Sequence, residues 1–394
     1  MKKILTVILT LCILFGNCFA SSAENEEKNK ADLNYFYSSA NIDLEYSVGS
    51  VYLCEATTGK VLYAENEFKA ASLASVTKVM TLLLVCEALE EGRINLNDIV
   101  VVSKKAASMG GSQVFLEEGE RISVEELIKA TVIASGNDSS VALAELCAGS
   151  ESEFVKQMNA KSTELGLKNT HFENTTGLDD TTTNHYSCAA DIAKMSQELI
   201  KHEIILKYSS IWQDTIRNGE FTLTNTNRLV RYYDGCNGLK TGSTDKAGFC
   251  ISATAKRGNM QLIAVVMGAQ TKDQRNEVAR SLLDYGFANF ALFEIPEKYI
   301  ENISVKSGIS DGVPIFSSPI RVVVNKSDLS KIQLEYEIPE SLSAPIKAGD
   351  IVGKIIYKIN GEQIEKSDIY VKDSVEKINV GKIFTRIIKR MICG

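Results

Sequence analysis

Three short strings, in a fixed order along the chain, constrain what this sequence can fold into more than any other feature. Residues 75–78 read Ser-Val-Thr-Lys, residues 135–137 read Ser-Gly-Asn and residues 240–242 read Lys-Thr-Gly. Each string recurs by chance on its own, but the ordered set combines a serine nucleophile with the lysine and asparagine groups that can activate it. The sequence therefore predicts a fold that gathers all three strings around one cleft, as the site of a serine acyl transfer that needs no histidine.

The first string is expected to open a buried helix over 75–89, an apolar run that ends before Gly92. Positions three apart share a helix face, so the Lys78 amine should lie beside the Ser75 hydroxyl. Burial and a nearby cation, for which Lys240 is the candidate, would lower the pKa of Lys78 and leave a neutral amine that accepts the serine proton. The alternative is a Lys78 side chain that extends to solvent.

The second string is expected in a loop between two buried helices. Ser123 and Glu126 form a capping-box pattern that begins one helix, and a second helix should start at Asp138 and end before Gly149. Within the loop, Ser135 can relay a proton, and the Asn137 amide can orient both the lysine and a substrate carbonyl. An ordinary Ser-Gly-Asn turn is the alternative for this string alone.

The third string is expected on, or just before, a strand. It precedes two β-prone runs, 249–255 and 262–267, which flank a turn at 257–259 and together predict a β-hairpin. A strand edge offers backbone groups to an extended peptide, and Gly242 allows a ligand to approach closely. Lys240 supplies positive potential for a carboxylate. The alternative is a turn that begins a strand, with the lysine merely exposed.

With these strings in place, the chain after its leader resembles the serine-type D-alanyl-D-alanine carboxypeptidases, which are low-molecular-mass penicillin-binding proteins. The resemblance extends to the surroundings of the strings, at residues 74–81, 174–179, 185–187, 225–227 and 238–244. It implies an α+β fold with a β-lactamase/transpeptidase-like catalytic domain, in which an antiparallel sheet packs against helices and an all-helical part holds the second string.

The resemblance also implies a mechanism. Ser75 would attack the bond between the two terminal D-alanines of a peptidoglycan stem peptide, and water would hydrolyse the acyl-enzyme, with Lys78, Ser135 and Asn137 as the other catalytic residues. No cofactor and no metal would take part. β-Lactam antibiotics, which imitate the D-Ala-D-Ala bond, would acylate the same serine.

Substrate binding, by the same resemblance, falls to Lys240, Thr241, Gly242 and Ser243, with the backbone amides of Ser75 and Ser243 holding the oxyanion. Arg275 stands where the family has an arginine that helps to hold the substrate carboxylate, and a guanidinium suits that role. The alternative for Arg275 is a surface arginine at the start of a helix.

Composition agrees with an exported enzyme. Residues 1–23 have two lysines, an apolar stretch and small residues near the end, which is typical of a secretory signal peptide. Removing them takes away two lysines and no acid, which moves the formal charge from −7 to −9 and argues against nucleic acid as a partner. The three histidines have no metal-ligand spacing, and the odd number of remaining cysteines argues against a disulfide framework, although Cys236 and Cys250 could pair.

Changes in residue composition and hydrophobic pattern divide the chain into further segments. Residues 24–41 are polar and predict a linker, and residues 42–293 predict the catalytic domain. Residues 297–374 predict a small β domain, because apolar and mostly polar residues alternate over 332–338 and Asn360-Gly361 separates two β-prone runs. The role of the small domain stays open between positioning the catalytic domain and contacting a partner.

Residues 376–394 predict an amphipathic cationic helix. Lying on a membrane surface, its apolar side would enter the acyl boundary while its cations meet anionic headgroups, which makes the protein extracytoplasmic and associated with the cell membrane. The alternative is a helix docked on the β domain.

Two other functions compete with the carboxypeptidase. A β-lactamase shares the three strings but needs a separate glutamate that activates water, and the sequence has no clear motif for one. A catalytically inactive cell-wall-binding protein would keep the fold, yet every residue of the three strings is present.

Overall fold

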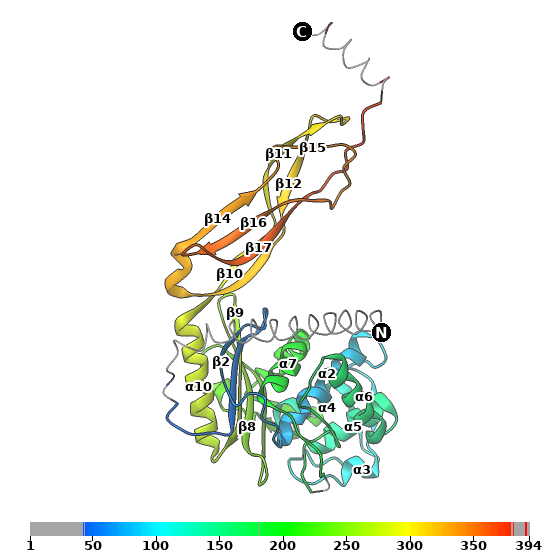
Figure 1. Cartoon of the computed structure of the whole chain (residues 1–394). Helices are drawn as coiled ribbons and strands as arrows, with labels where there is room; N and C mark the ends of the chain where they lie inside the picture. The colour runs from blue at the N-terminus through cyan, green and yellow to red at the C-terminus, as the bar shows by residue number, and fades with distance from the viewer. Residues whose placement is uncertain (1–41, 43, 181, 380, 382–390, 392–394) are drawn as a thin grey trace, which may run out of the picture. The chain divides into compact units, whose positions relative to one another are not determined.

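The computed structural model of the chain describes residues 42, 44–180, 182–379, 381 and 391 (Figure 1). The predicted signal peptide and the linker that follows it lie outside the described residues. The contacts divide the chain into two compact units, with the division between Ala288 and Asn289. Each unit is described by itself below.

The first unit is built on a five-stranded sheet with the strand order β2-β1-β9-β8-β7, in which every neighbouring pair is antiparallel. The predicted hairpin is confirmed as β8–β9, and β1 and β2 form a second antiparallel hairpin. The third string lies on β7, at one edge of the sheet. The strands are β1 (Ser50–Glu55), β2 (Val61–Glu65), β7 (Cys236–Thr244), β8 (Gly248–Arg257) and β9 (Met260–Ala269).

One helix covers each face of this sheet (Figure 1). On one face, α10 (Lys272–Asn289) packs so closely that a Cβ at Gly286 would lie 2.5 Å from a methyl group of Leu262. On the other face, α7 (Ala189–Leu199) is joined to β8 by a hydrogen bond of 2.7 Å between the hydroxyls of Ser196 and Ser252. The central strands are therefore buried on both sides, which makes β7 a rigid support for the third string.

The remaining helices of the first unit, with two short strand pairs among them, form a mainly helical part that carries the first two strings. The capping box at Ser123 is confirmed at the start of α4, and Gly149, at φ 78°, ends α5 in the left-handed conformation that glycine favours. The elements are η1 (Ala74–Thr77), α2 (Lys78–Glu90), α3 (Lys104–Ala107), α4 (Val124–Ile133), α5 (Asn137–Ala148), α6 (Glu151–Glu164), α8 (Glu203–Ser209) and α9 (Leu229–Tyr232), with the short pairs β3 (Ile99–Val101) and β4 (Arg121–Ser123), and β5 (Gln213–Ile216) and β6 (Phe221–Thr224).

Two helix boundaries differ from the prediction. The helix expected over 75–89 begins as the 3₁₀ turn η1 and becomes α-helical only at Lys78. Ala74 has φ 47°, so the chain enters η1 from the left-handed region, which apolar periodicity does not encode. The sequence places Asn137 in the loop, but it is the first residue of α5, which leaves residues 134–136 as the connection.

The second unit is β-rich. Its six-stranded sheet has the order β14-β16-β17-β12-β11-β15, and β10 pairs with β13 along its full length, so the strand that ends the predicted 42–293 segment belongs to this unit. Its core consists of aliphatic side chains around Tyr357. The strands are β10 (Phe290–Ile295), β11 (Lys298–Lys306), β12 (Gly312–Ser317), β13 (Ile320–Asn325), β14 (Ile332–Glu337), β15 (Ser341–Ser343), β16 (Ile351–Ile359) and β17 (Glu362–Val371).

The sequence signals in this unit have mixed outcomes. The turn at Asn360-Gly361 is confirmed between β16 and β17, with both residues at positive φ. The alternating run is also a strand, β14, but its apolar side chains do not form a buried face, since Leu334 is 45% and Tyr336 is 53% exposed. β14 lies at the edge of the sheet and pairs with β16 alone, so its side chains have neighbouring strand residues on one flank only.

The predicted C-terminal helix is wrong over its first residues. Residues 376–378 are extended, because Ile309 N donates to Glu376 O and Ile378 N donates to Ser307 O. The rest of the predicted helix lies almost entirely outside the described residues. Within the described part of the chain, no helix is both long and apolar enough to cross a bilayer.

Candidate active site

Ser75 and Lys78 meet as the first string predicts. Ser75 lies on the 3₁₀ turn with its side chain partly accessible, while Lys78 begins α2 and is fully buried. Lys78 Nζ lies 2.9 Å from Ser75 Oγ. The hydroxyl is therefore within hydrogen-bond reach of the amine while it remains open to a substrate.

The Lys78 amine has two further partners. Nζ donates to Asn137 Oδ1 over 2.6 Å and to Thr176 O over 3.0 Å. Desolvation is the first cause that holds the pKa of Lys78 well below its ordinary value, and the charge of Lys240 is the second, while the Asp138 carboxylate acts in the opposite direction. The structure thus puts Lys78 in surroundings that favour the neutral amine.

Ser135 and Asn137 hold the two lysines from one side. Ser135 has φ 63°, a conformation uncommon for a residue other than glycine, which aims the side chain from the end of α4. Asn137 Nδ2 donates to Gly110 O over 2.7 Å, and this bond turns Oδ1 towards Lys78. The second string thereby fixes the orientation of an acceptor for the catalytic amine.

Lys240 lies on β7 and is 1% exposed. Its Nζ donates to Ser135 Oγ over 2.8 Å and to Thr241 O over 3.0 Å. Burial lowers the pKa of Lys240 to about 7, with the charge of Arg275 as the second cause. The third string is therefore joined directly to the second.

The rest of the third string lines the edge of the cleft. Thr241 Oγ1 donates to Thr226 Oγ1 over 2.8 Å, and the backbone of Gly242 lies so close to the 3₁₀ turn that a Cβ would be 2.7 Å from Ser75 N. Ser243 is exposed on the edge strand. Glycine is needed at position 242 because any side chain there would collide with the nucleophile's own amide.

Arg275 is not a surface arginine. It lies in the first turns of α10, is 4% exposed, and its guanidinium donates to Asn276 Oδ1 over 3.0 and 3.2 Å. Burial lowers the pKa of Arg275 to about 10. Its charge in turn acts on Lys240, so it belongs to the electrostatic surroundings of the site.

Several contacts of the site have no signal in the three strings. Thr176 O receives a hydrogen bond from Lys78, and Asp179 receives hydrogen bonds from Ser72 and Thr244. The stretch 174–179 stands out in the sequence only through the family resemblance. A backbone carbonyl such as that of Thr176 has no residue-type signature, so sequence reasoning could not assign its role.

His185 supports the turn that carries the nucleophile. Glu173 N donates to His185 Nδ1 over 3.0 Å, so the proton of the neutral ring is on Nε2, which lies 2.8 Å from Thr77 Oγ1. Thr77 Oγ1 donates in turn to Ala74 O over 2.8 Å. Desolvation lowers the pKa of His185 to about 4, from an ordinary value of 6.5.

This histidine predicts a loss of stability in mild acid. The folded-state pKa of His185 is depressed, so between pH 6.5 and 4 the unfolded chain binds a proton that the folded chain does not. The contribution of His185 to the free energy of unfolding is therefore complete above pH 6.5 and is lost as the pH falls towards 4. The loss amounts to about 3 kcal/mol. Denaturant unfolding between pH 7 and 4 should show a His185→Asn variant with a flatter pH dependence than the native chain; parallel curves would contradict the assignment.

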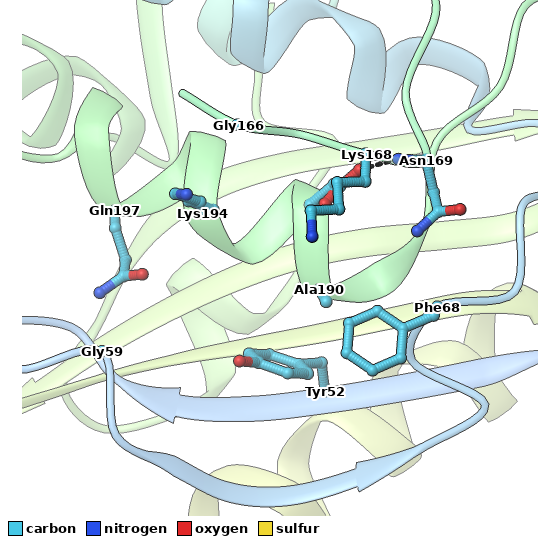
Figure 2. A pocket seen from close by; sticks show the side chains of 10 residues that line it. Tyr52, Gly59, Phe68, Gly166, Lys168, Asn169, Ala190, Lys194 and Gln197 are labelled. Carbon is cyan, nitrogen blue, oxygen red and sulfur yellow. Dashed lines mark hydrogen bonds between the residues drawn. The ribbon is translucent and has the colours of Figure 1, made fainter. Parts of the chain in front are cut away.

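Two surface hollows lie at different distances along the chain from the site residues. Figure 2 shows a pocket of about 390 Å³ beside β1 and the start of α7, into which Phe68, Tyr52 and Lys168 project, and it contains none of the site residues above. A second hollow of about 630 Å³ begins at Ser243 and Thr244, at the end of β7. Only the second adjoins the three strings.

The cysteines and the metal-ligating side chains add little to the site. Cys236 and Cys250 are both free thiols, opposite Ala255 and Gly242 respectively, so the pair left open by the sequence does not form. Across the described residues, no group of three or more His, Cys, Asp and Glu side chains is arranged to hold a metal ion.

Comparison with known proteins gives two family matches. The model described as D-alanyl-D-alanine carboxypeptidase matches residues 37–271, and the model described as penicillin-binding protein 5, C-terminal domain, matches residues 287–377. A curated relative, D-alanyl-D-alanine carboxypeptidase DacF of Bacillus subtilis, is 41% identical over 384 residues, which cover 96% of this chain and 95% of the relative.

Solved structures agree with these matches. Penicillin-binding protein 5 of Haemophilus influenzae superposes with a TM-score of 0.74 at 32% identity, covering 84% of this chain and 98% of the other. Penicillin-binding protein D2 of Listeria monocytogenes, solved in its ampicillin-bound form, superposes with a TM-score of 0.58 at 29% identity, covering 62% of this chain and 99% of the other.

Proposed function

The chain belongs to the D-alanyl-D-alanine carboxypeptidase family and is a serine-type carboxypeptidase of the penicillin-binding class, and on this premise we propose that Ser75 is its nucleophile and Lys78 the base. Ser75 Oγ attacks the carbonyl carbon between the two terminal D-alanines of a peptidoglycan stem pentapeptide. The new ester bond forms as the peptide C–N bond breaks. Water then hydrolyses the ester and regenerates the serine.

The count of donors around Lys78 carries this proposal. An ammonium has three N–H donors and no acceptor, whereas a neutral amine has two donors and one lone pair. Two of the three Lys78 partners, Asn137 Oδ1 and Thr176 O, can only accept, and the third is the Ser75 hydroxyl. An ammonium could donate to all three partners, so the lowered pKa of Lys78 favours the neutral amine, which satisfies both carbonyls and keeps its lone pair for the serine proton.

Ser135 and Lys240 are proposed to complete the proton transfers. The proton that Lys78 removes from the nucleophile has to reach the departing amine nitrogen, and Ser135 Oγ, fixed by Lys240 at 2.8 Å, is the relay. After this transfer Lys78 is neutral again. The amine can then activate the water that hydrolyses the acyl-enzyme, again within reach of Asn137.

Substrate binding is proposed on β7. The backbone amides of Ser75 and Ser243 would hold the oxyanion, which is supported by the close approach of Gly242 to Ser75 N. The terminal carboxylate of the substrate would lie near Thr241 and Lys240, with the buried Arg275 charge behind them. By the same route, a β-lactam ring would acylate Ser75.

The proposal is tested with a pentapeptide ending in D-Ala-D-Ala. The native chain is expected to release one D-alanine per peptide. In a second experiment, mass spectrometry of a penicillin-treated sample locates the penicilloyl adduct. An adduct on the peptide containing Ser75 supports the assignment, and an adduct elsewhere refutes it. Fast, sustained turnover of nitrocefin without D-alanine release would favour a β-lactamase instead.

The charges of Arg275 and Lys240 predict a pH effect. The pKa of Lys240 is about 7, so the ammonium that attracts the substrate carboxylate is lost at alkaline pH and kcat/KM should decline there. Arg275→Gln removes a cation that lowers this pKa. The variant should bind substrate less well, and the alkaline limb of its kcat/KM profile should move to higher pH. A profile that keeps the native limb would contradict the coupling.

Export and membrane attachment are the parts of the proposal that rest on sequence. The family agrees with an extracytoplasmic location, and the sequence after residue 379, if helical, would place its apolar and cationic side chains on largely opposite faces, as a helix on an anionic membrane surface requires. A chain truncated after Asn379 keeps the pairing of 376–378 with Ser307 and Ile309. The full chain should sediment with anionic vesicles and the truncated chain should not; equal sedimentation would refute the anchor.

A further inference from the structure

One carboxylate links the two segments that carry the oxyanion amides. Asp179 Oδ1 accepts a hydrogen bond from Ser72 Oγ over 2.8 Å, and Asp179 Oδ2 accepts a short one from Thr244 Oγ1. Ser72 shortly precedes the nucleophile Ser75, and Thr244 directly follows Ser243 on β7. The carboxylate therefore links the segment that precedes the Ser75 amide to the residue that follows the Ser243 amide.

Among the described residues, no hydrogen bond connects residues 72–77 directly with β7, although the two backbones are in close contact at Gly242. Van der Waals contact alone sets a minimum distance between them. A bridging carboxylate also limits how far they can move apart.

The segment before Asp179 is held firmly enough to act as a support. Gly177 has φ 82°, and a Cβ there would lie 1.8 Å from Ala74 O, so residues 174–179 lie directly on the turn that carries the nucleophile. Thr175 O accepts hydrogen bonds from Thr81 and Ser140. Asp179 thus starts from a fixed backbone, and its two bonds transmit that position to both segments.

We propose that Asp179 is a positioning residue that holds the Ser75 and Ser243 amides at the spacing required by the developing oxyanion. The inference rests on the proposed function, because it assumes that these two amides stabilise the transition state. In this role Asp179 acts through the two segments that it bridges, without requiring a contact of its own with the substrate. Since oxyanion contacts strengthen as charge develops, loss of the bridge should lower kcat more than it raises KM.

The experiment compares Asp179→Ala with Asp180→Ala, which removes the exposed carboxylate next in the chain. Asp179→Ala is expected to lower both kcat for D-alanine release and the rate constant of acylation by a penicillin by about 10- to 100-fold, with KM nearly unchanged. Asp180→Ala should keep native values. Asp179→Asn should recover most of the activity, because the amide can still bond both hydroxyls once one of them rotates.

The two arms of the bridge supply a second measurement. Ser72→Ala and Thr244→Val each remove one arm, and because a bridge needs both, the double variant should be little worse than either single variant. These variants decide the question if Asp179→Ala does not fold. The proposal would be overturned by a native kcat in Asp179→Ala or by a change in KM alone. It would also be overturned if the effects of Ser72→Ala and Thr244→Val on kcat were strictly additive. If Ser75→Ala is inactive in the same assays, such a result refutes the bridge and leaves the proposed function standing.

Discussion

Replacing Ser75 by alanine is expected to abolish D-alanine release and penicillin labelling together. The reaction then has no nucleophile, and the loss should be about 10⁶-fold in kcat, the scale seen when a catalytic serine is removed from a hydrolase. The fold should be kept, since Ser75 is partly accessible and its hydroxyl has Lys78 as its partner. Stopped assays of D-alanine and fluorescent penicillin on gels measure both effects.

Ser108 provides the matched control for this experiment. It is an exposed serine whose hydroxyl bonds only Lys105 O at the end of α3. Ser108→Ala should retain native activity and thermal stability. Substantial D-alanine release by Ser75→Ala, with the control behaving as stated, would show that another residue attacks the substrate.

Replacing Lys78 by methionine is expected to have the second largest effect. Methionine keeps the length and the burial of the side chain but cannot accept a proton, so the acylation rate constant should fall by about 10³- to 10⁴-fold. Lys78→Arg should be as slow, because a guanidinium stays protonated even when buried. The acylation rate constant is measured with a fluorescent penicillin under single-turnover conditions.

An exposed lysine serves as the control for the loss of one positive charge and the gain of one methionine. Lys168→Met changes an exposed lysine beside the pocket in Figure 2, away from the three strings, and should leave acylation unchanged. Fast acylation of the Lys78→Met variant would mean that the serine proton leaves by another route, and the donor count around this amine would then have no catalytic meaning.

The three strings could be found in the sequence because each depends on residue type. Ser75, Lys78 and Lys240 are chemically distinctive, and their spacing along the chain places them on elements that apolar periodicity also predicts. The second string needed one adjustment, since Asn137 starts α5 and does not precede it. A capping position is a local backbone choice, and a polar residue there is compatible with either side of the boundary.

Other parts of the site are set by tertiary contacts that sequence patterns do not contain. The left-handed Ala74 and the glycine at 177 follow from two segments that pack backbone to backbone. The bridge through Asp179 joins residues far apart in the chain. In the second unit, β14 has a strand pattern but an exposed apolar side, because alternation predicts the strand and not what covers it.

The central claim is that Lys78 is a neutral amine before substrate arrives. The side-chain nitrogen signals of the native chain, assigned by comparison with Lys78→Met and Lys240→Met, can be followed by nuclear magnetic resonance as the pH is raised. At pH 8 the Lys78 signal should already have the chemical shift of a free amine, since desolvation, the largest cause of its lowered pKa, acts whether or not Lys240 is charged. A Lys78 signal that keeps the shift of an ammonium ion up to the ordinary lysine pKa would contradict the account.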